Sequence, residues 1–569
     1  MNGVLILLLW LCSLGAQAAA DTLRIKQLQH CGDLFSDSQQ QWCLRAEGLG
    51  ANLPTVWLGG VRLSEANVGR QGDRLTLKLA REAQHSAPLW LADGGRTSNP
   101  VWLTRQRSHV IAAGPDEVAK NMDGLTTYVD LVSLLIEEKY DGLDEARRIA
   151  GKYGAQVVGA IPPLNVYQLR LPVEDLMQRD AMVLRMGSEV SVDAVIVEES
   201  APERGEEGNG RGTRAIDQAD EWAANRFMDA LYFYRRRIAA SGLPVKPVRV
   251  GVIEREVDFD APGFGHYRGG CEQGQTCLYA RDGDRPASHG SHVAGILAAQ
   301  GEGFLPGLGK HSPGFEVMVE RNSDAGITAN IAASVNLVED GVRVLNWSWG
   351  IHRVGARDVN GDEVDSLVRS GLAMSGYEEL LEEFFLWLRK EHPDVVVVNS
   401  AGNGASWSGT DEYRLPSSFI TEQLLVVGGH QRSGKATAVE AHDHVRKRHS
   451  SNIDMRVDVS AAACIRPVSA EAAHCGTSYA TPLVTATVAT MLSINPALTP
   501  EQVRMLLRRS ALTLGAEQDF EAMDAEDLTA PILPSERGGR LNDPDLGRSA
   551  RLDMQRALDL AVQSLERVR

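Results

Sequence analysis

The feature that most constrains the fold is an alternation of short apolar segments with helical stretches between residues 215 and 563. The apolar segments are rich in β-branched residues, as buried strands are, and lie at 248–253, 342–345 and 395–398. Helical patterning occupies the stretches between and after them, at 292–300, 327–339, 377–389 and 479–494. Strands that alternate with helices predict an α/β fold, in which helices cover both faces of a parallel sheet.

Composition narrows the class of protein. The chain has 569 residues, of which 43% are hydrophobic and 23% are charged, a balance typical of a soluble globular protein and not of a disordered one. Its 58 basic and 75 acidic residues give a formal charge of −17. Because such a charge repels phosphates, we expect no nucleic-acid partner. At about 100–200 residues per domain, the length predicts three or four domains.

The N-terminal residues have the pattern of an export signal. Residues 4–16 form an uncharged apolar run that is too short to span a membrane comfortably, and small residues follow at Ala16, Ala18, Ala19 and Ala20. We interpret residues 1–20 as a cleaved signal peptide, although the first three residues carry no Lys or Arg; a retained anchor is the alternative. The sequence therefore predicts a periplasmic or secreted protein without membrane insertion after cleavage.

The cysteines support an oxidising compartment. Seven are present, and removal of the signal peptide with Cys12 leaves six. They fall into three close pairs, and we expect local bridges at 31–43, 271–277 and 464–475, with buried free thiols as the alternative. None of the spacings resembles a zinc site, so no metal-binding residues are predicted from them.

Two smaller units and a linker precede the α/β region. Residues 27–106 contain short strands separated by turn residues, and Gly48–Gly50, Gly59–Val61 and Gly94–Val101 resemble the IPT/TIG immunoglobulin-like module. The resemblance implies a β-sandwich that binds or spaces, whose partner the sequence does not identify. Residues 111–199 read as an α+β unit. Residues 199–214 are Gly-rich and charged, which predicts a flexible linker and a cleavage site.

Four motifs within the α/β region carry residues suited to catalysis. They are Val250–Asp258, Ser288–Gly295, Asn399–Gly404 and Gly476–Pro482. In this order, acid, His, Asn and Ser, they resemble the subtilase (subtilisin-like serine peptidase) family over residues 215–563. The resemblance implies a subtilisin-like parallel sheet. Residues 111–199, which precede this region, resemble the propeptide-like domain that acts as folding chaperone and inhibitor in that family. An ordinary α+β spacer is the alternative for this unit.

The resemblance implies a nucleophile and a base. Ser478 lies where a Gly-Thr turn enters an apolar helix, so its hydroxyl and backbone N–H lie at the positive helix end. A serine hydroxyl needs a base, which His289 supplies. An N-cap serine is the alternative for Ser478. His292, three residues after His289, is expected to pack against the sheet.

The same resemblance assigns an oxyanion donor and an acid. The Asn403 side-chain amide follows a strand and suits the oxyanion role, with a turn asparagine in the left-handed conformation as the alternative. At the strand end the family has Asp, followed two residues later by Gly, whereas this chain has Glu254 and Glu256. Glu254 can orient the His289 imidazole, because glutamate serves as the triad acid in other hydrolases. A lost acid, or one relocated to Asp258 or Asp260, is the alternative.

Substrate binding and calcium complete the expectations. Ser348, Trp349 and Gly350 occupy the family's substrate-binding position, where an extended peptide pairs with the enzyme as a β-strand. The alternative is that Trp347 and Trp349 simply pack. Subtilases often bind calcium, but the glycine in 358–365 is out of register with a calcium loop, so a solvated acidic turn is favoured and no cofactor is expected.

These observations predict an exported serine endopeptidase that acts on a protein or peptide substrate and processes itself from a zymogen. Glu replaces Asp in its triad. The alternative is a catalytically degenerate pseudopeptidase that kept the fold and acts as a binding or scaffolding protein. Glu254 is the residue that distinguishes the two hypotheses.

Overall fold

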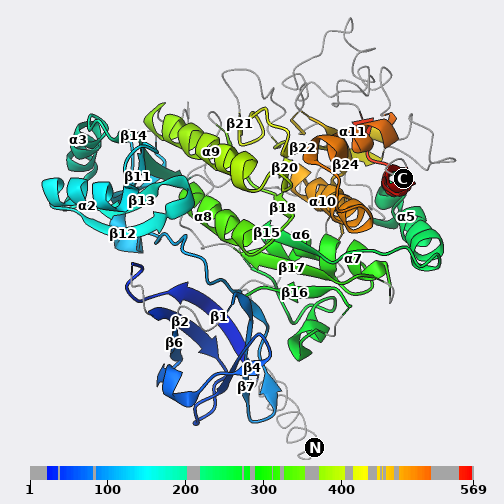
Figure 1. Ribbon diagram of the computed structural model, residues 1–569, viewed down its shortest axis with the longest axis horizontal. Coiled ribbons are helices and arrows are strands. Elements are labelled where there is room, and N and C mark those ends of the chain that lie inside the picture. Colours follow the sequence, from blue (N-terminus) through cyan, green and yellow to red (C-terminus); the bar gives the residue numbers. More distant parts are fainter. Residues whose placement is uncertain are drawn as a thin grey trace, which may run out of the picture.

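The structure is a computed structural model (Figure 1). It describes residues 22–35, 39–80, 85–122, 124–200, 218–254, 256–271, 274–281, 289–309, 312–320, 326–352, 371–403, 414–432, 445–448, 451–452, 457–466, 473–513 and 550–566. The signal peptide predicted at 1–20, residues 201–214 of the predicted linker and the acidic turn at 358–365 lie outside these ranges.

The N-terminal unit is a β-sandwich. One antiparallel sheet contains β1 (Arg24–His30), β2 (Gln39–Glu47), β6 (Arg74–Ala80) and β5 (Val68–Gln71). The other contains β4 (Val61–Arg62), β3 (Thr55–Leu58), β7 (Ala87–Asp93), β8 (Arg96–Thr97) and β9 (Val101–Leu103). Alternate residues of β6, Leu75, Leu77 and Leu79, face a core that both sheets share. This inside-outside alternation makes the two sheets pack face to face.

The second unit is an α+β domain. Its antiparallel sheet has the order β10 (Val118–Lys120), β11 (Thr126–Ile136), β13 (Val166–Arg170) and β12 (Gln156–Ile161), and β14 (Val192–Ser200) also pairs with β11. Helices α2 (Gly142–Tyr153) and α3 (Leu176–Met186) pack on this sheet. Asp141 accepts a hydrogen bond from Asp144 N at the start of α2, which ends at Gly154 with φ +69°. Because β14 continues to Ser200, the predicted linker starts inside this strand.

The large unit has the predicted parallel sheet. Its parallel strands are β16 (Cys277–Tyr279), β17 (Phe315–Glu320), β15 (Val248–Ile253), β18 (Val344–Trp347), β20 (Val396–Ser400), β22 (Leu424–Arg432), β24 (Val459–Ala462) and β28 (Ala550–Arg551). The antiparallel strands β23 (Val445–Lys447) and β27 (Leu512–Thr513) extend it. The strand predicted at 248–253 has these bounds, whereas β18 and β20 run two residues further than predicted.

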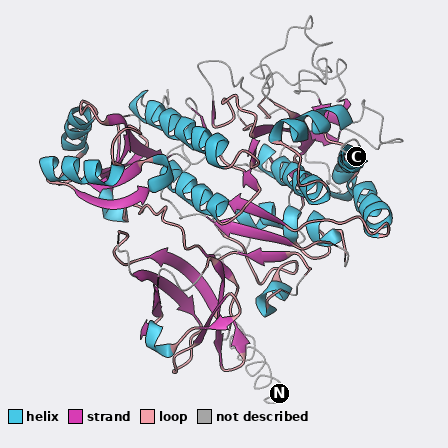
Figure 2. Ribbon diagram, in the orientation of Figure 1, coloured by secondary structure: helices cyan, strands magenta, loops and turns pink. Residues whose placement is uncertain are grey.

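Helices cover both faces of this sheet (Figures 1 and 2). Helices α8 (Gly326–Glu339) and α9 (Gly371–Glu391) share one core with Leu345 and Val397. The opposite core holds Val344 and Val396 with side chains from α5 (Phe227–Phe233), α6 (His289–Ala298), α7 (Phe304–Gly307), α10 (Thr477–Ile494), α11 (Pro500–Ser510) and α13 (Met554–Glu566). The short helix α4 (Gln218–Ala223) leads into α5. Adjacent strand residues thus enter opposite cores, which confirms the predicted α/β class.

Both N-terminal units dock on the large unit. From the sandwich, Trp102 is 2% exposed and donates through Nε1 to Asp340 Oδ2 at 2.8 Å. From the α+β domain, the buried Glu198 carboxylate accepts hydrogen bonds from Ile327 N at 3.2 Å and Thr328 N at 2.9 Å, at the start of α8. The carboxylate therefore caps a helix of the neighbouring unit.

The structure contains the three local disulfides expected from the cysteine spacing, Cys31–Cys43, Cys271–Cys277 and Cys464–Cys475. Within the described ranges, no helix is both long and apolar enough to cross a membrane.

Candidate active site

The predicted functional residues gather at one edge of the parallel sheet. Strands β15, β18 and β20 are neighbours and run in the same direction, so their carboxyl ends lie side by side. Glu254 follows β15, Ser348 follows β18 and Asn403 follows β20. Helices α6 and α10 provide His289 and Ser478 from their first turns. Ligands of open parallel sheets bind at this edge.

The structure brings Glu254 to His289. The distance from His289 Nδ1 to Glu254 Oε1 is 3.0 Å, and the glutamate side chain is 6% exposed while the histidine side chain is 37% exposed. A hydrogen bond at Nδ1 fixes the imidazole tautomer and leaves Nε2 for the base role. Helix α6 starts at His289 itself, three residues before the predicted start.

Close backbone approach accommodates this acid. A Cβ atom at Gly290 would lie 2.5 Å from the Glu256 carbonyl oxygen and 3.4 Å from Glu254 Cβ. Only glycine therefore allows the first turn of α6 to pack so closely against the segment after β15. Glu254 lies next to His289 even though Glu256 replaces the glycine that the family has two residues after its aspartate.

The alternative acids are engaged elsewhere. Asp258 Oδ1 accepts a hydrogen bond from Asp260 N at 2.9 Å, within its own turn. The Asp260 carboxylate pairs with Arg268 at 2.9 Å and also with Arg24 of the sandwich. These contacts hold both aspartates in the turn after β15, and Glu254 is the acid in contact with His289.

Ser478 is the second residue of α10. The N-cap of this helix is Gly476, without a side-chain cap, so the N-cap interpretation of Ser478 is wrong. Ser478 is 2% exposed, and its hydroxyl donates to the Ser348 carbonyl oxygen at 3.4 Å. The Tyr479 ring lies 5.4 Å from the His289 ring, which places this helix start alongside the imidazole. The residue thus sits at the positive end of an 18-residue buried helix.

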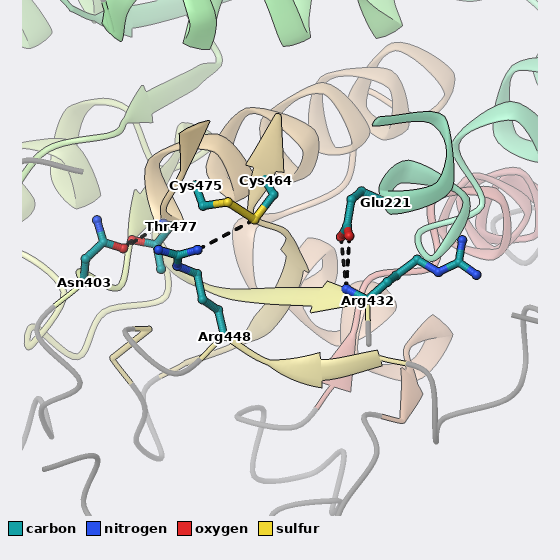
Figure 3. The surroundings of a disulfide bond; sticks show 7 residues. All are labelled: Glu221, Asn403, Arg432, Arg448, Cys464, Cys475 and Thr477. Atoms are coloured by element: carbon teal, nitrogen blue, oxygen red, sulfur yellow. Dashed lines mark hydrogen bonds between the residues drawn. A yellow bond between two sulfur atoms is a disulfide. The ribbon is translucent and has the colours of Figure 1, made fainter. Parts of the chain in front are cut away.

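Asn403 has a fixed orientation. Its Oδ1 atom accepts hydrogen bonds from Thr477 N at 2.9 Å and Thr477 Oγ1 at 3.2 Å, as Figure 3 shows. Because the oxygen is held by the start of α10, the amide nitrogen points away from it. The positive φ of this turn, +101°, belongs to Gly402 and not to Asn403, so the left-handed asparagine alternative is wrong.

The segment 347–349, which includes two of the residues predicted to bind substrate, is held by two asparagines that the sequence analysis did not single out. Asn399 donates to the carbonyl oxygens of Trp347 at 2.8 Å and Trp349 at 2.9 Å. Asn346 donates to Ser348 Oγ at 2.9 Å. An asparagine at the end of an otherwise apolar strand was the available signal, because a buried amide needs partners.

The two tryptophans differ in role. Trp347 is fully buried, and its ring lies 5.2 Å from Phe384 in α9, as the packing alternative expected. Trp349 is 9% exposed, with its ring 5.0 Å from that of Trp347. Gly350 follows immediately and precedes the short strand β19 (Ile351–His352).

With this geometry in place, sequence comparison identifies the large unit. Residues 273–539 match the model of the subtilase family. This part of the chain belongs to the subtilase family. The match does not include the segment that holds Glu254.

Individual relatives are distant. A protein named probable subtilase-type serine protease from Deinococcus radiodurans is 23% identical over 445 residues, which cover 71% of this chain and 55% of that protein. The chain thus spans about half the length of this relative. Subtilisin from Bacillus pumilus is 26% identical over 275 residues, covering 47% of this chain and 85% of subtilisin. Among solved structures, fervidolysin from Fervidobacterium pennivorans, a keratinolytic enzyme related to subtilisin, has 16% identity and a TM-score of 0.46, covering 79% of this chain and 63% of fervidolysin.

A disulfide lies directly before the turn that leads to Ser478 (Figure 3). Cys464 and Cys475 join the paired strands β25 (Cys464–Ile465) and β26 (His474–Cys475), directly before Gly476. The ring of His474 lies 4.8 Å from that of His292, and the His292 ring lies 6.0 Å from Tyr479. His292 therefore faces α10, whereas the sequence predicted that it packs against the sheet.

Burial keeps these neighbouring imidazoles uncharged. Burial is the main cause that lowers the pKa of His292 to about 4, and the neighbouring His474 and His289 imidazoles contribute to the same shift. Burial and His289 also lower the pKa of His474. At neutral pH both side chains are consequently neutral beside His289.

No group of three or more His, Cys, Asp or Glu side chains suited to hold a metal ion occurs among the residues that the structure describes. The acidic segment 358–365 lies outside them.

Proposed function

We propose that the protein is an exported serine endopeptidase in which Glu254, His289 and Ser478 form the catalytic triad. The 3.0 Å contact between His289 Nδ1 and Glu254 Oε1 carries this proposal. Through this contact, Glu254 has the role that aspartate has in the family, which is to hold the imidazole tautomer and stabilise the imidazolium. The substrate is a protein or peptide, and it pairs with Ser348, Trp349 and Gly350 as an extended strand.

The reaction proceeds through an acyl-enzyme. The Ser478 hydroxyl turns from the Ser348 carbonyl to His289 Nε2, transfers its proton there, and its oxygen attacks the scissile carbonyl carbon. The C–N bond then breaks, and His289 gives the proton to the leaving amine. A water molecule enters, His289 removes its proton, and the water oxygen attacks the acyl carbon. The bond between this carbon and Ser478 Oγ then breaks, and His289 returns the proton to Oγ, which regenerates Ser478 and releases the carboxylic acid product.

The tetrahedral intermediates need donors for their oxyanion. Asn403 Nδ2 and the Ser478 backbone N–H supply them in this proposal. The hydrogen bonds from Thr477 to Asn403 Oδ1 support it, because they orient the amide before substrate arrives. Preorganised donors of this kind stabilise the transition state more than donors that must reorient.

The N-terminal units keep the peptidase folded or latent until cleavage within 199–214. Glu198 supports this part of the proposal, because its carboxylate joins the α+β domain to the first turn of α8. The three disulfides support export, since such bonds persist in oxidising compartments.

Labelling with a fluorophosphonate tests the activity, because this reagent needs an activated serine. Wild type is expected to label, and Ser478→Ala is expected to lose all labelling. Ser188→Ala is the matched control, because it changes an exposed serine of the α+β domain, and it should label like wild type. A correctly folded wild type that does not label would favour the pseudopeptidase that acts as a scaffold.

Intact-mass analysis tests self-processing. Wild type is expected to lose its N-terminal units by cleavage within 199–214, whereas Ser478→Ala should retain them. An unchanged cleavage pattern in Ser478→Ala would refute self-maturation without affecting the assignment of the triad.

A further inference from the structure

A buried arginine lies beside the proposed substrate site. Arg414 belongs to the short strand β21 (Arg414–Leu415), which pairs antiparallel with β19, directly after Gly350. Its side chain is 1% exposed. The guanidinium stays positively charged under all physiological conditions. A desolvated cation at this position therefore shapes the electrostatic field of the site.

The guanidinium is held by the strand that leads to Asn403. Nη2 donates to Ser400 Oγ at 3.1 Å, and Nη1 donates to the Ser400 carbonyl oxygen. Nη1 also lies 3.5 Å from Asn399 Oδ1. Since Asn399 donates to the Trp349 carbonyl, Arg414 and the substrate-binding segment share a common anchor.

Two glycines show where the side chain runs. A Cβ atom added at Gly350 would overlap the Arg414 guanidinium, and one at Gly402 would lie 2.7 Å from Arg414 Nε. Arg414 thus lies between the substrate-binding segment and the turn that holds Asn403, with its guanidinium against Gly350. Both segments flank Ser478, through the Ser348 carbonyl and through Thr477.

In the proposed reaction, the residue whose carbonyl is attacked, the P1 residue, binds against these two segments. Its carbonyl must lie between Ser478 and Asn403 for attack and oxyanion stabilisation. The P1 side chain then projects between the two flanking segments, toward Arg414. A carboxylate there forms a charge-assisted hydrogen bond with the guanidinium, while a cationic side chain is repelled.

We propose that Arg414 determines specificity and that the peptidase cleaves after acidic residues, Glu or Asp. The inference rests on the proposed function and names the substrate class of the same site. The sequence of the predicted linker offers a natural substrate of this class. In its part after β14, residues 201–214, the acidic P1 candidates are Glu203, Glu206 and Glu207, and the basic ones are Arg204, Arg211 and Arg214.

Matched peptides that differ only at P1 test the proposal. With wild type at neutral pH, kcat/KM for P1 Glu should exceed that for the isosteric P1 Gln by about 10-fold to 100-fold, the range expected for a charged hydrogen bond. The ratio should fall toward one as the pH drops through the P1 carboxyl pKa of about 4.3. Equal or faster cleavage of P1 Gln, or a preference for P1 Lys, would overturn it.

Variants assign the effect to the residue. Arg414→Met should abolish the Glu/Gln ratio, and Arg414→Lys, which keeps the charge, should retain part of it. Fluorophosphonate labelling of each variant verifies that the site is folded. A labelled Arg414→Met that keeps the full ratio would overturn the role of Arg414.

Binding separates this inference from the proposed function. Fluorescent P1 Glu and P1 Gln peptides are titrated against Ser478→Ala, and anisotropy should show tighter binding of P1 Glu by about 10-fold or more. Failure of the proposed function would appear as a wild type that neither labels nor hydrolyses. Failure of the present inference would appear as hydrolysis and binding without preference for the acidic peptide.

Discussion

At the residue scale, the site depends on groups whose orientation is fixed by their neighbours. Asn403 illustrates this, because Thr477 N and Oγ1 both donate to its Oδ1 atom. The same contact that starts α10 therefore aims the amide nitrogen. The oxygen has a structural role, and we assign the nitrogen the catalytic one.

Asn403→Asp separates the two roles. Aspartate keeps an acceptor for Thr477 but has no N–H₂ donor, so kcat should fall about 10²-fold to 10³-fold with little change in KM. Asn403→Ala, which loses both, should show a similar loss of kcat together with lower thermal stability. Steady-state kinetics and melting curves measure these effects. An Asp variant with wild-type kcat would exclude Asn403 as an oxyanion donor.

Sequence reasoning located the residues that lie in short motifs but not those defined by contacts between motifs. Glu254, His289, Asn403 and Ser478 follow or begin elements whose patterns are local, and they meet because parallel strands end at one edge. The anchoring role of Asn399 and the position of Arg414 depend on segments that meet only after folding. The type of a residue does not by itself indicate which distant segments it will contact.

At the element scale, helix starts set the geometry. Strand positions were predictable because β-branched runs such as 248–253 are continuous, whereas helix starts were less predictable. The sequence around His289 is rich in small residues, which obscure the helical periodicity of apolar side chains, so the start of α6 was placed three residues late. Its close packing against Glu256, allowed by Gly290, is a tertiary effect.

The start of α8 gives a testable case, because its cap comes from another unit. Glu198→Ala removes the acceptor of Ile327 N and Thr328 N, and should cost about 1–3 kcal/mol of stability. We expect a lower urea midpoint and faster proteolytic release of the α+β domain. Glu174→Ala, at an exposed position of the same domain, is the control. If both variants behave like wild type, this carboxylate does not contribute to docking.

At the scale of the whole molecule, the sheet holds buried groups that resist protonation. His430 in β22 is fully buried and lies 3.1 Å from Asn225 Nδ2 through Nε2. Burial holds the pKa of His430 well below its ordinary value of 6.5, and the charge of Arg551 lowers it further. The folded protein therefore keeps this imidazole neutral where the unfolded chain protonates it.

The sign of the resulting pH dependence follows from proton binding. The depressed pKa of folded His430 means that the unfolded state binds the extra proton below pH 6.5, so stability falls as the pH drops through this value. In a Ser478→Ala background, His430→Gln should flatten the melting temperature between pH 7 and 5, while exposed His85→Gln should not. Identical pH profiles for all three proteins would contradict this origin.

The central claim is that Glu254 acts as the acid of the triad. Its most direct test is kcat/KM for one peptide with wild type, Glu254→Gln and Glu254→Asp. Glutamine retains size but cannot hold the imidazole in the working tautomer or stabilise the imidazolium, so Glu254→Gln should lose about 10⁴-fold in kcat. Glu254→Asp keeps the charge and should be much less impaired. Glu254→Gln with the activity of wild type would contradict the account, because the 3.0 Å contact with His289 would then have no catalytic role.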